Sequence, residues 1–89
     1  MHVRKIVITS NFFKAFLKLA RDTQERATKA ENLFRANPMH PSLRMHPLKG
    51  EWQGFWSISV IMNIRIIFER MEDGDIIFLT IGKHDIYRS

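Results

Sequence analysis

The hydrophobic residues of the chain follow two periods, which predict one strand, two helices and three further strands. Segment 3–8 is short, apolar and rich in β-branched residues, as is typical of a strand. Apolar residues then recur at the three-to-four-residue spacing of a helix, as Phe13, Phe16, Leu17 and Ala20. We expect this face to pack on the core, with Ser10 as the N-cap of the helix.

A second helix is predicted from Asp22 or Thr23 to about Ala36. Asn37 and Pro38 end it, because the residue before a proline is pushed out of the α region. Its expected core face consists of small or apolar residues at helical spacing: Ala27, Ala30, Leu33 and Phe34. The small alanines allow the two helices to approach closely as a hairpin.

From Phe55 onward the apolar and polar residues alternate with a period of two, which indicates strands. Residues 72–75 (Glu-Asp-Gly-Asp) are a hairpin signal between the last two strands. The three consecutive strands are predicted at 55–60, 63–70 and 76–81. Segment 38–54 shows no obvious element and holds all three prolines. Irregular segments of this length often carry function.

The predicted order is therefore β-α-α-β-β-β, in the α+β class. A helical hairpin is expected to pack on one face of an antiparallel sheet. At 89 residues the chain has room for one domain, so we assign residues 1–89 to a single domain.

The charge balance indicates a polyanionic partner. Fourteen Lys and Arg against nine Asp and Glu give a net charge of +5, and small basic domains commonly bind nucleic acid or acidic proteins. The longest apolar run without a charge, 55–63, is far shorter than the roughly 20 residues that span a membrane. The N-terminal apolar stretch is too short for a signal peptide. We therefore expect a cytoplasmic protein with no membrane partner.

Three stretches of the chain, in this order, resemble the RelE/ParE toxin superfamily, and its RelE and YafQ members in particular. The resemblance covers nearly the whole chain. In the third stretch the tyrosine comes one residue earlier than in the motif Ile-Gly-x-His-Asp-x-x-Tyr of many members. The stretches are the loop 43–50 followed by 54–59, the strand 63–68 with its central Arg65, and the ending 81–87 with His84 and Tyr87.

This resemblance implies a ribosome-dependent mRNA endonuclease that is neutralised by an acidic antitoxin. Its expected partners are mRNA, the 16S rRNA of the ribosomal A site and the antitoxin, and the free toxin is expected to be a monomer. The superfamily leaves two alternatives open. A ParE-like chain would inhibit DNA gyrase by binding without catalysis, and an inactive homologue would act only as a partner of its antitoxin.

Metal-free RNA cleavage needs a base for the 2′-hydroxyl, a cation for the phosphate and an acid for the leaving oxygen. Arg65 is the expected phosphate clamp, since it interrupts an apolar strand; a solvated charge on an open face is the alternative. His84 is expected to act as acid or base, with Asp85 orienting a histidine; an exposed polar tail is the other interpretation.

His46 and Lys49 complete the expected catalytic group from within the long loop. His46 is the other half of an acid/base pair and Lys49 stabilises the pentavalent phosphate, unless this basic loop only touches rRNA backbone. Tyr87 either stacks on a base, acts as a weak acid or packs the C-terminus onto the sheet. Trp56 is expected in the core because it alternates with apolar residues.

The remaining candidates are contacts to RNA rather than catalytic groups. Trp52 either stacks on a base or covers the edge of the core. These expected RNA contacts are Arg44, Trp52, Lys83 and Arg88. The four histidines lack metal-ligand spacing and the chain has no cysteine, so we expect neither a metal nor another cofactor.

Overall fold

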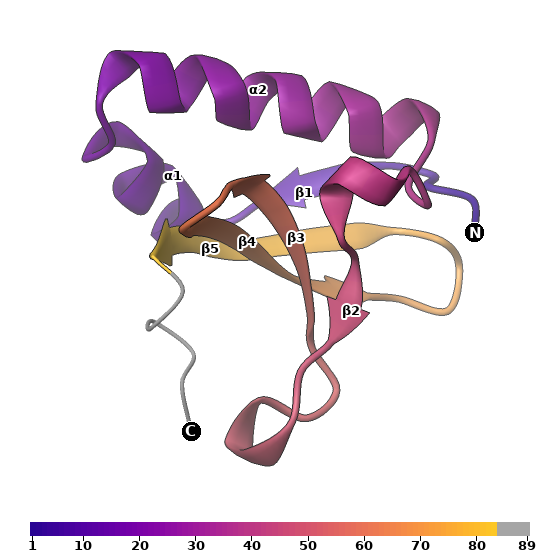
Figure 1. Ribbon diagram of the computed structural model, residues 1–89. Coiled ribbons are helices and arrows are strands. Elements are labelled where there is room, and N and C mark those ends of the chain that lie inside the picture. Colours follow the sequence, from indigo (N-terminus) through magenta and orange to yellow (C-terminus); the bar gives the residue numbers. More distant parts are fainter. Residues whose placement is uncertain (84–89) are drawn as a thin grey trace.

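The computed structural model describes residues 1–83; residues 84–89 lie outside the described part. It has two helices on one five-stranded sheet (Figure 1), in the predicted α+β class. The elements are β1 (Ile6–Ile8), α1 (Ser10–Leu17), α2 (Arg21–Ala36), β2 (His46–Pro47), β3 (Trp56–Ile61), β4 (Ile64–Arg70) and β5 (Ile76–Lys83). Two short 3-10 turns, η1 (Pro41–Leu43) and η2 (Gly50–Trp52), flank β2.

The sheet is mixed, whereas the sequence predicted an antiparallel one. The strand order is β1-β5-β4-β3-β2, and every neighbouring pair is antiparallel except β1 with β5. In that pair Val7 lies opposite Ile77 in parallel register. Parallel strands need a long connection. The helices and the other strands supply one here, because β1 and β5 lie at opposite ends of the chain.

One strand was missed in the segment predicted to be irregular. His46 and Pro47 form β2 and pair with Ser57 and Trp56 at the edge of the sheet. Proline cannot donate to a ladder and is therefore confined to edge strands. The edge position explains why this two-residue strand has no apolar alternation of its own.

The buried face of α1 differs from the prediction. Phe12 is the buried residue of this helix, whereas Phe13 and Leu17 are 54% and 57% exposed. Phe16 packs partly against the core, as expected. The N-cap is Thr9 rather than Ser10, and its hydroxyl oxygen accepts the backbone N–H of Phe12 at 3.1 Å. The helix is thus rotated by about one residue from the predicted orientation.

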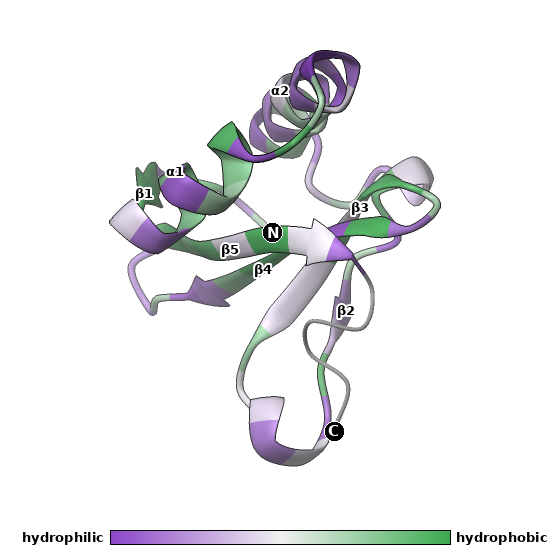
Figure 2. Cartoon of the chain, turned by 90° about the vertical axis from the view of Figure 1, so that its left-hand side faces the viewer, coloured by the Kyte–Doolittle hydropathy of each residue, from purple (hydrophilic) through white to green (hydrophobic). Residues whose placement is uncertain are grey.

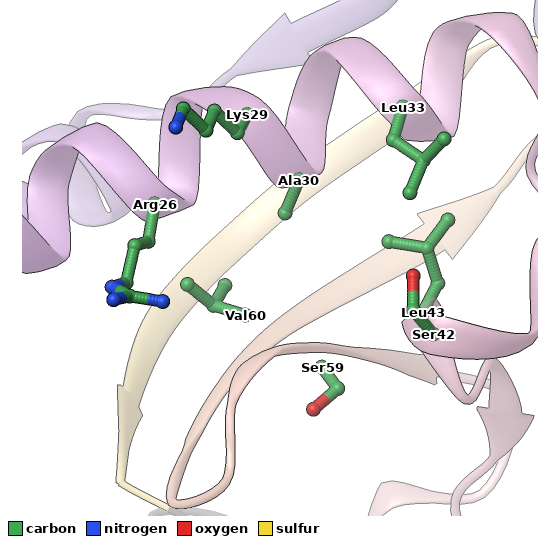
Figure 3. Close-up of a pocket in the computed structure, with 8 residues that line it drawn as sticks. All are labelled: Arg26, Lys29, Ala30, Leu33, Ser42, Leu43, Ser59 and Val60. Carbon is green, nitrogen blue, oxygen red and sulfur yellow. The ribbon is translucent and has the colours of Figure 1, made fainter.

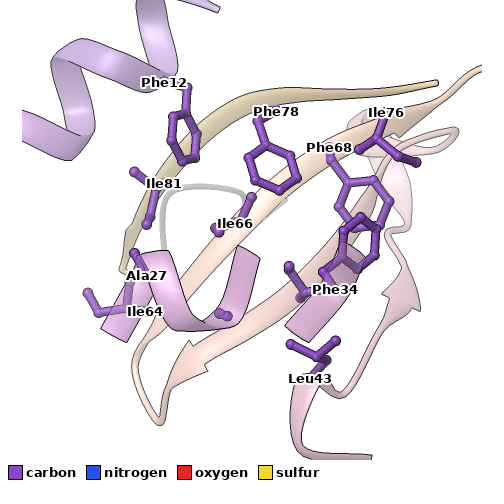
Figure 4. Close-up of a cluster of buried hydrophobic side chains, with 12 residues drawn as sticks. Phe12, Ala27, Phe34, Leu43, Ile64, Ile66, Phe68, Ile76, Phe78 and Ile81 are labelled. Carbon is purple, nitrogen blue, oxygen red and sulfur yellow. The ribbon is translucent and has the colours of Figure 1, made fainter. Parts of the chain in front are cut away.

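The core is centred on aromatic rings that join the helices to β4 and β5 (Figure 4). Phe34 of α2 lies 5.1 Å from Phe68 and 6.2 Å from Phe78 between ring centroids, and all three are fully buried. Phe12 of α1 lies 5.2 Å from Phe78. The predicted core face of α2 is confirmed: Ala27 and Ala30 are buried, and Leu33 packs against the cluster.

Both helices cover the same face of the sheet, and the loop between β2 and β3 projects on the side away from them (Figures 1 and 2). The outer surface of α2 is largely hydrophilic, whereas much of the sheet is apolar (Figure 2). Within residues 1–83, neither helix has the length and hydrophobicity that a membrane crossing requires. Because both helices cover one face of the sheet, the functional site is expected on the second face.

Replacing Phe34 with Ala should lower the free energy of unfolding by about 3–5 kcal/mol, because the fully buried ring leaves a cavity between α2 and the sheet. Phe13→Ala is the matched control, since this ring is more than half exposed. Chemical denaturation measures both. A loss for Phe13→Ala as large as that for Phe34→Ala would contradict the observed orientation of α1.

Candidate functional site

Alternation along β4 separates a core face from a second face that carries the predicted site. Ile64, Ile66 and Phe68 belong to the core cluster beneath the helices, so Arg65 and Ile67 point to the opposite face. Directly paired residues of neighbouring strands share a face. Two rows of the second face follow from the register: His46–Ser57–Ile67–Thr80 and Ser59–Arg65–Gly82.

Arg65 is partly buried and holds the turn between β3 and β4. Its Nη1 donates to Ser59 Oγ at 2.8 Å and to the carbonyl oxygens of Ile61 and Met62, each at 3.0 Å. Among residues 1–83, no acceptor lies within hydrogen-bond range of Nη2. One end of the guanidinium is thus fixed to the hairpin while the other is available to an anion. The two interpretations of Arg65, a phosphate clamp and a solvated charge, both assumed a side chain that is not bonded to the rest of the protein. Neither predicted its hydrogen bonds to the β3–β4 turn.

His46 lies on the same face and its ring is oriented by the backbone. Nδ1 lies 2.9 Å from the carbonyl oxygen of Arg44. A carbonyl can only accept, so Nδ1 carries the hydrogen. In the neutral ring Nε2 then keeps its lone pair, the form a general base requires. Arg44 itself adopts a left-handed backbone conformation at φ 47°, which is energetically unfavourable for residues other than glycine.

The register places His46 and Arg65 on one surface without bringing them into direct contact. His46 is two strands away from β4, about 10 Å at the usual strand spacing. Arg65 lies two residues further along β4 from Ile67, which is in the row of His46. Two long side chains at this separation can face one nucleotide from two sides.

Polar atoms lie beneath this face where apolar packing would be more stable. Ser57 is fully buried, and neither its Oγ nor Nε of Arg65 has a hydrogen-bond partner within the described residues. A buried polar group without a partner costs about 1–3 kcal/mol, so these residues are not explained by stability. Ser59 was not among the predicted site residues. The alternation of serines along β3 was the signal that could have identified it as the partner of Arg65.

The loop between β2 and β3 holds two further predicted residues, Lys49 and Trp52, which lie outside the two rows of the second face. Lys49 is exposed and precedes η2, and Trp52 lies within η2. Trp52 packs edge-on against Phe55 at 5.8 Å between ring centroids. It is therefore partly held by the loop. Trp56 packs against the core as expected, with the Arg70 guanidinium 4.8 Å from its ring centroid.

The remaining predicted residues either lie on the helix side of the sheet or fall outside the described residues. Lys83 is exposed at the end of β5 and lines a hollow beside α1, on the helix side of the sheet. His84 and Asp85 directly follow β5 in the sequence. Together with Tyr87 and Arg88, they lie outside the described residues, so their roles stay predictions.

Two further features bear on the chemistry of the molecule. In the described part of the chain, no three His, Asp or Glu side chains gather as metal ligands. A hollow of about 210 Å³ lies between α2, η1 and β3 (Figure 3), with Arg26 and Lys29 beside apolar Leu33 and Val60. Its lining contains no histidine and no carboxylate, so it does not suit the expected chemistry.

Comparisons with known proteins agree with this fold. The family model described as bacterial toxin of type II toxin-antitoxin system, YafQ, matches residues 4–88. Among solved structures, E. coli YafQ is 23% identical with a TM-score of 0.72, over 89% of this chain and 91% of that one. A YoeB/ParE toxin from Agrobacterium tumefaciens is 18% identical with a TM-score of 0.73, over 90% and 98%.

YafQ in the E. coli DinJ-YafQ toxin-antitoxin complex is 21% identical with a TM-score of 0.72, over 94% of this chain and 96% of that one. No curated protein sequence matches the chain. At these identities the structural likeness supports the fold, while the family match spans nearly the whole sequence.

Replacing Arg65 with Ala should lower the free energy of unfolding by about 1–3 kcal/mol, because three acceptors of the β3–β4 turn lose a charged donor. Lys83→Ala, an exposed change on the neighbouring strand, should leave stability unchanged. Urea denaturation followed by circular dichroism measures both. Equal midpoints for wild type and Arg65→Ala would show that these bonds do not hold the turn.

Proposed function

Because the chain belongs to the YafQ family of bacterial type II toxins, we propose that it is an endoribonuclease that cuts mRNA in the ribosomal A site. The observation that carries this proposal is the second face of the sheet. There a histidine with a backbone-fixed tautomer and a half-anchored arginine share one surface. Ribonuclease chemistry requires an acid/base group and a phosphate-binding cation on one surface.

The proposed reaction uses the RNA's own 2′-hydroxyl as nucleophile. The 2′-oxygen attacks the adjacent phosphorus and loses its proton to a base, and the bond from phosphorus to the 5′-oxygen breaks. An acid protonates that leaving oxygen. The products are a 2′,3′-cyclic phosphate on the upstream fragment and a 5′-hydroxyl on the downstream fragment. This step needs no metal.

We assign roles to the residues by what each can supply. His46, with a free Nε2, suits the base, and His84 is the proposed acid, although their roles are interchangeable in this scheme. Arg65 binds the phosphate through Nη2, which has no acceptor among residues 1–83. Lys49 adds charge near the pentavalent phosphate, and Asp85 orients a histidine.

The bases and the backbone of the substrate are held by groups around this centre. Tyr87 and Trp52 are proposed to stack on bases. Arg44 and Arg88 are proposed to contact RNA phosphates, with 16S rRNA as an additional partner.

The proposed regulator is an acidic antitoxin that binds this basic chain. The complex of YafQ with DinJ supports such a partner for a family member, and the net charge of +5 favours an acidic one. A substrate bound to ribosomes implies that the protein acts in the cytoplasm.

Brief induction of the wild-type chain should create new mRNA 5′ ends that require translation, as mapped by primer extension. Arg65→Ala and His84→Ala should each remove these ends, because the phosphate cation or an acid/base group is lost. Lys29→Ala, an exposed change on α2 outside the proposed catalytic group, is the matched control and should cut normally.

Two outcomes of the same mapping would contradict the endonuclease. Intact mRNA together with growth arrest would favour an inhibitor of gyrase, which DNA damage would then reveal. Intact mRNA with normal growth would favour an inactive family member.

The ends of the cut RNA test the chemistry separately from the site of cutting. Downstream fragments should carry a 5′-hydroxyl, so polynucleotide kinase should label them without prior phosphatase treatment. A single 2′-deoxy substitution at the cut nucleotide should abolish cleavage. Downstream fragments with a 5′-phosphate would contradict attack by the 2′-hydroxyl.

A further inference from the structure

A hollow of about 380 Å³ lies between α1 and the ends of β4 and β5, on the helix side of the sheet. Lys14 and Lys18 of α1 and Lys83 of β5 line it, together with the amide side chain of Asn11. All three lysines are exposed. None of the described residues that line this basic groove is acidic.

The lysines of the basic groove keep their charge available to a ligand. Within residues 1–83, no carboxylate lies within 4.0 Å of any of their ammonium groups. The cations at the opposite end of the sheet are arranged differently. There Arg4 lies 2.8 Å from Asp75, and Lys5 lies 4.0 Å from it. Among residues 1–83, basic side chains are thus paired with carboxylates at one end of the sheet, whereas the three lysines at the other end have no carboxylate partner.

The distribution of acidic residues strengthens this polarity. Four of the nine carboxylates of the chain lie around the turn between β4 and β5: Glu69, Glu72, Asp73 and Asp75. The basic groove lies at the other end of these two strands. A long polyanion is therefore attracted more strongly to the end of the sheet that holds the basic groove than to the other end.

The basic groove is continuous with the proposed catalytic face. Arg65 pairs directly with Gly82, which carries no side chain, and Lys83 is the next residue of β5. Alternation turns Lys83 to the helix side, where it meets the two lysines of α1. Lys14 and Lys18 are one helical turn apart, about 6 Å along the axis. Cations therefore follow a path from Arg65 around the end of the sheet and along α1.

We propose that this basic groove binds the phosphates of the single-stranded RNA on one side of the nucleotide held at Arg65. The inference rests on the proposed RNA cleavage and adds a second contact for the same strand. Lysine side chains are long and flexible, so they can contact the successive phosphates of an RNA backbone. Such contacts do not recognise individual bases. The basic groove determines the path of the RNA, and the catalytic face determines where the RNA is cleaved.

Binding of a 2′-O-methylated oligouridylate tests the groove without cleavage, because this probe has no nucleophilic 2′-hydroxyl. Fluorescence anisotropy gives its Kd at several salt concentrations. The variant Lys14→Gln/Lys18→Gln/Lys83→Gln should reduce the slope of log Kd against log salt by about 2, since each phosphate contact on a single strand contributes about 0.7.

The matched control is Arg21→Gln/Arg26→Gln/Lys29→Gln, which removes three exposed charges from α2. Its slope should stay that of the wild type. Equal slopes for all three proteins, or an equal decrease in both variants, would overturn the groove as a local site. Unchanged RNA binding with lost binding of poly-L-glutamate by the groove variant would also overturn it, in favour of an acidic protein.

Failure of the proposed function gives a different result from failure of the groove. A wild-type chain that binds the probe with the expected slope but cuts no mRNA retains the groove and contradicts the endonuclease. A groove variant that cuts mRNA and binds the probe with the wild-type slope contradicts the groove alone.

Discussion

The packing of Phe34 against Phe68 and Phe78 decides which face of the sheet is available for function. These rings join α2 to the two central strands, and Phe12 joins α1 to the same cluster. Both helices are thereby held on one face. The partly exposed Ser59 and Arg65 of β3 and β4 are left on the other face.

Arg65 connects the fold with its proposed chemistry. Part of its guanidinium holds the β3–β4 turn through Ser59 and two carbonyl oxygens, and the remaining part stays unoccupied within the described residues. A cation fixed in this way loses little conformational freedom when it binds a phosphate. His46 is fixed in the same manner by the carbonyl oxygen of Arg44. In both cases backbone carbonyl oxygens help to orient the functional group, and Ser59 Oγ adds a side-chain acceptor for Arg65.

The sequence predicted the orientation of those elements whose hydrophobic pattern allows only one buried face. The core face of α2 and the strand β3 are examples, because polar residues occupy most of their other faces. In α1, apolar residues at 12, 13, 16 and 17 cover two sides of the helix, so periodicity alone did not fix which side is buried. Thr9 and Ser10 are both good caps, and the choice between them depends on the same orientation.

The site was predictable in part for a related reason. Alternation along β4 was enough to place Arg65 on the open face. The position of His46 depends on its pairing with Ser57, a contact across the sheet that no local pattern contains. The position of Lys83 was likewise not contained in a local pattern, because β5 extends two residues further than predicted. That extension turns its side chain to the helix side, where it lines the basic groove.

Nuclear magnetic resonance titration of the labelled protein with an uncleavable 2′-O-methylated RNA tests the central claim most directly. The claim is that RNA binds the sheet face opposite the helices. The largest shifts of backbone amides should then occur at His46, Ser59 and Arg65, with smaller ones along α1. Shifts confined to α2 and η1 would contradict the account, because RNA would then bind away from His46, Arg65 and α1.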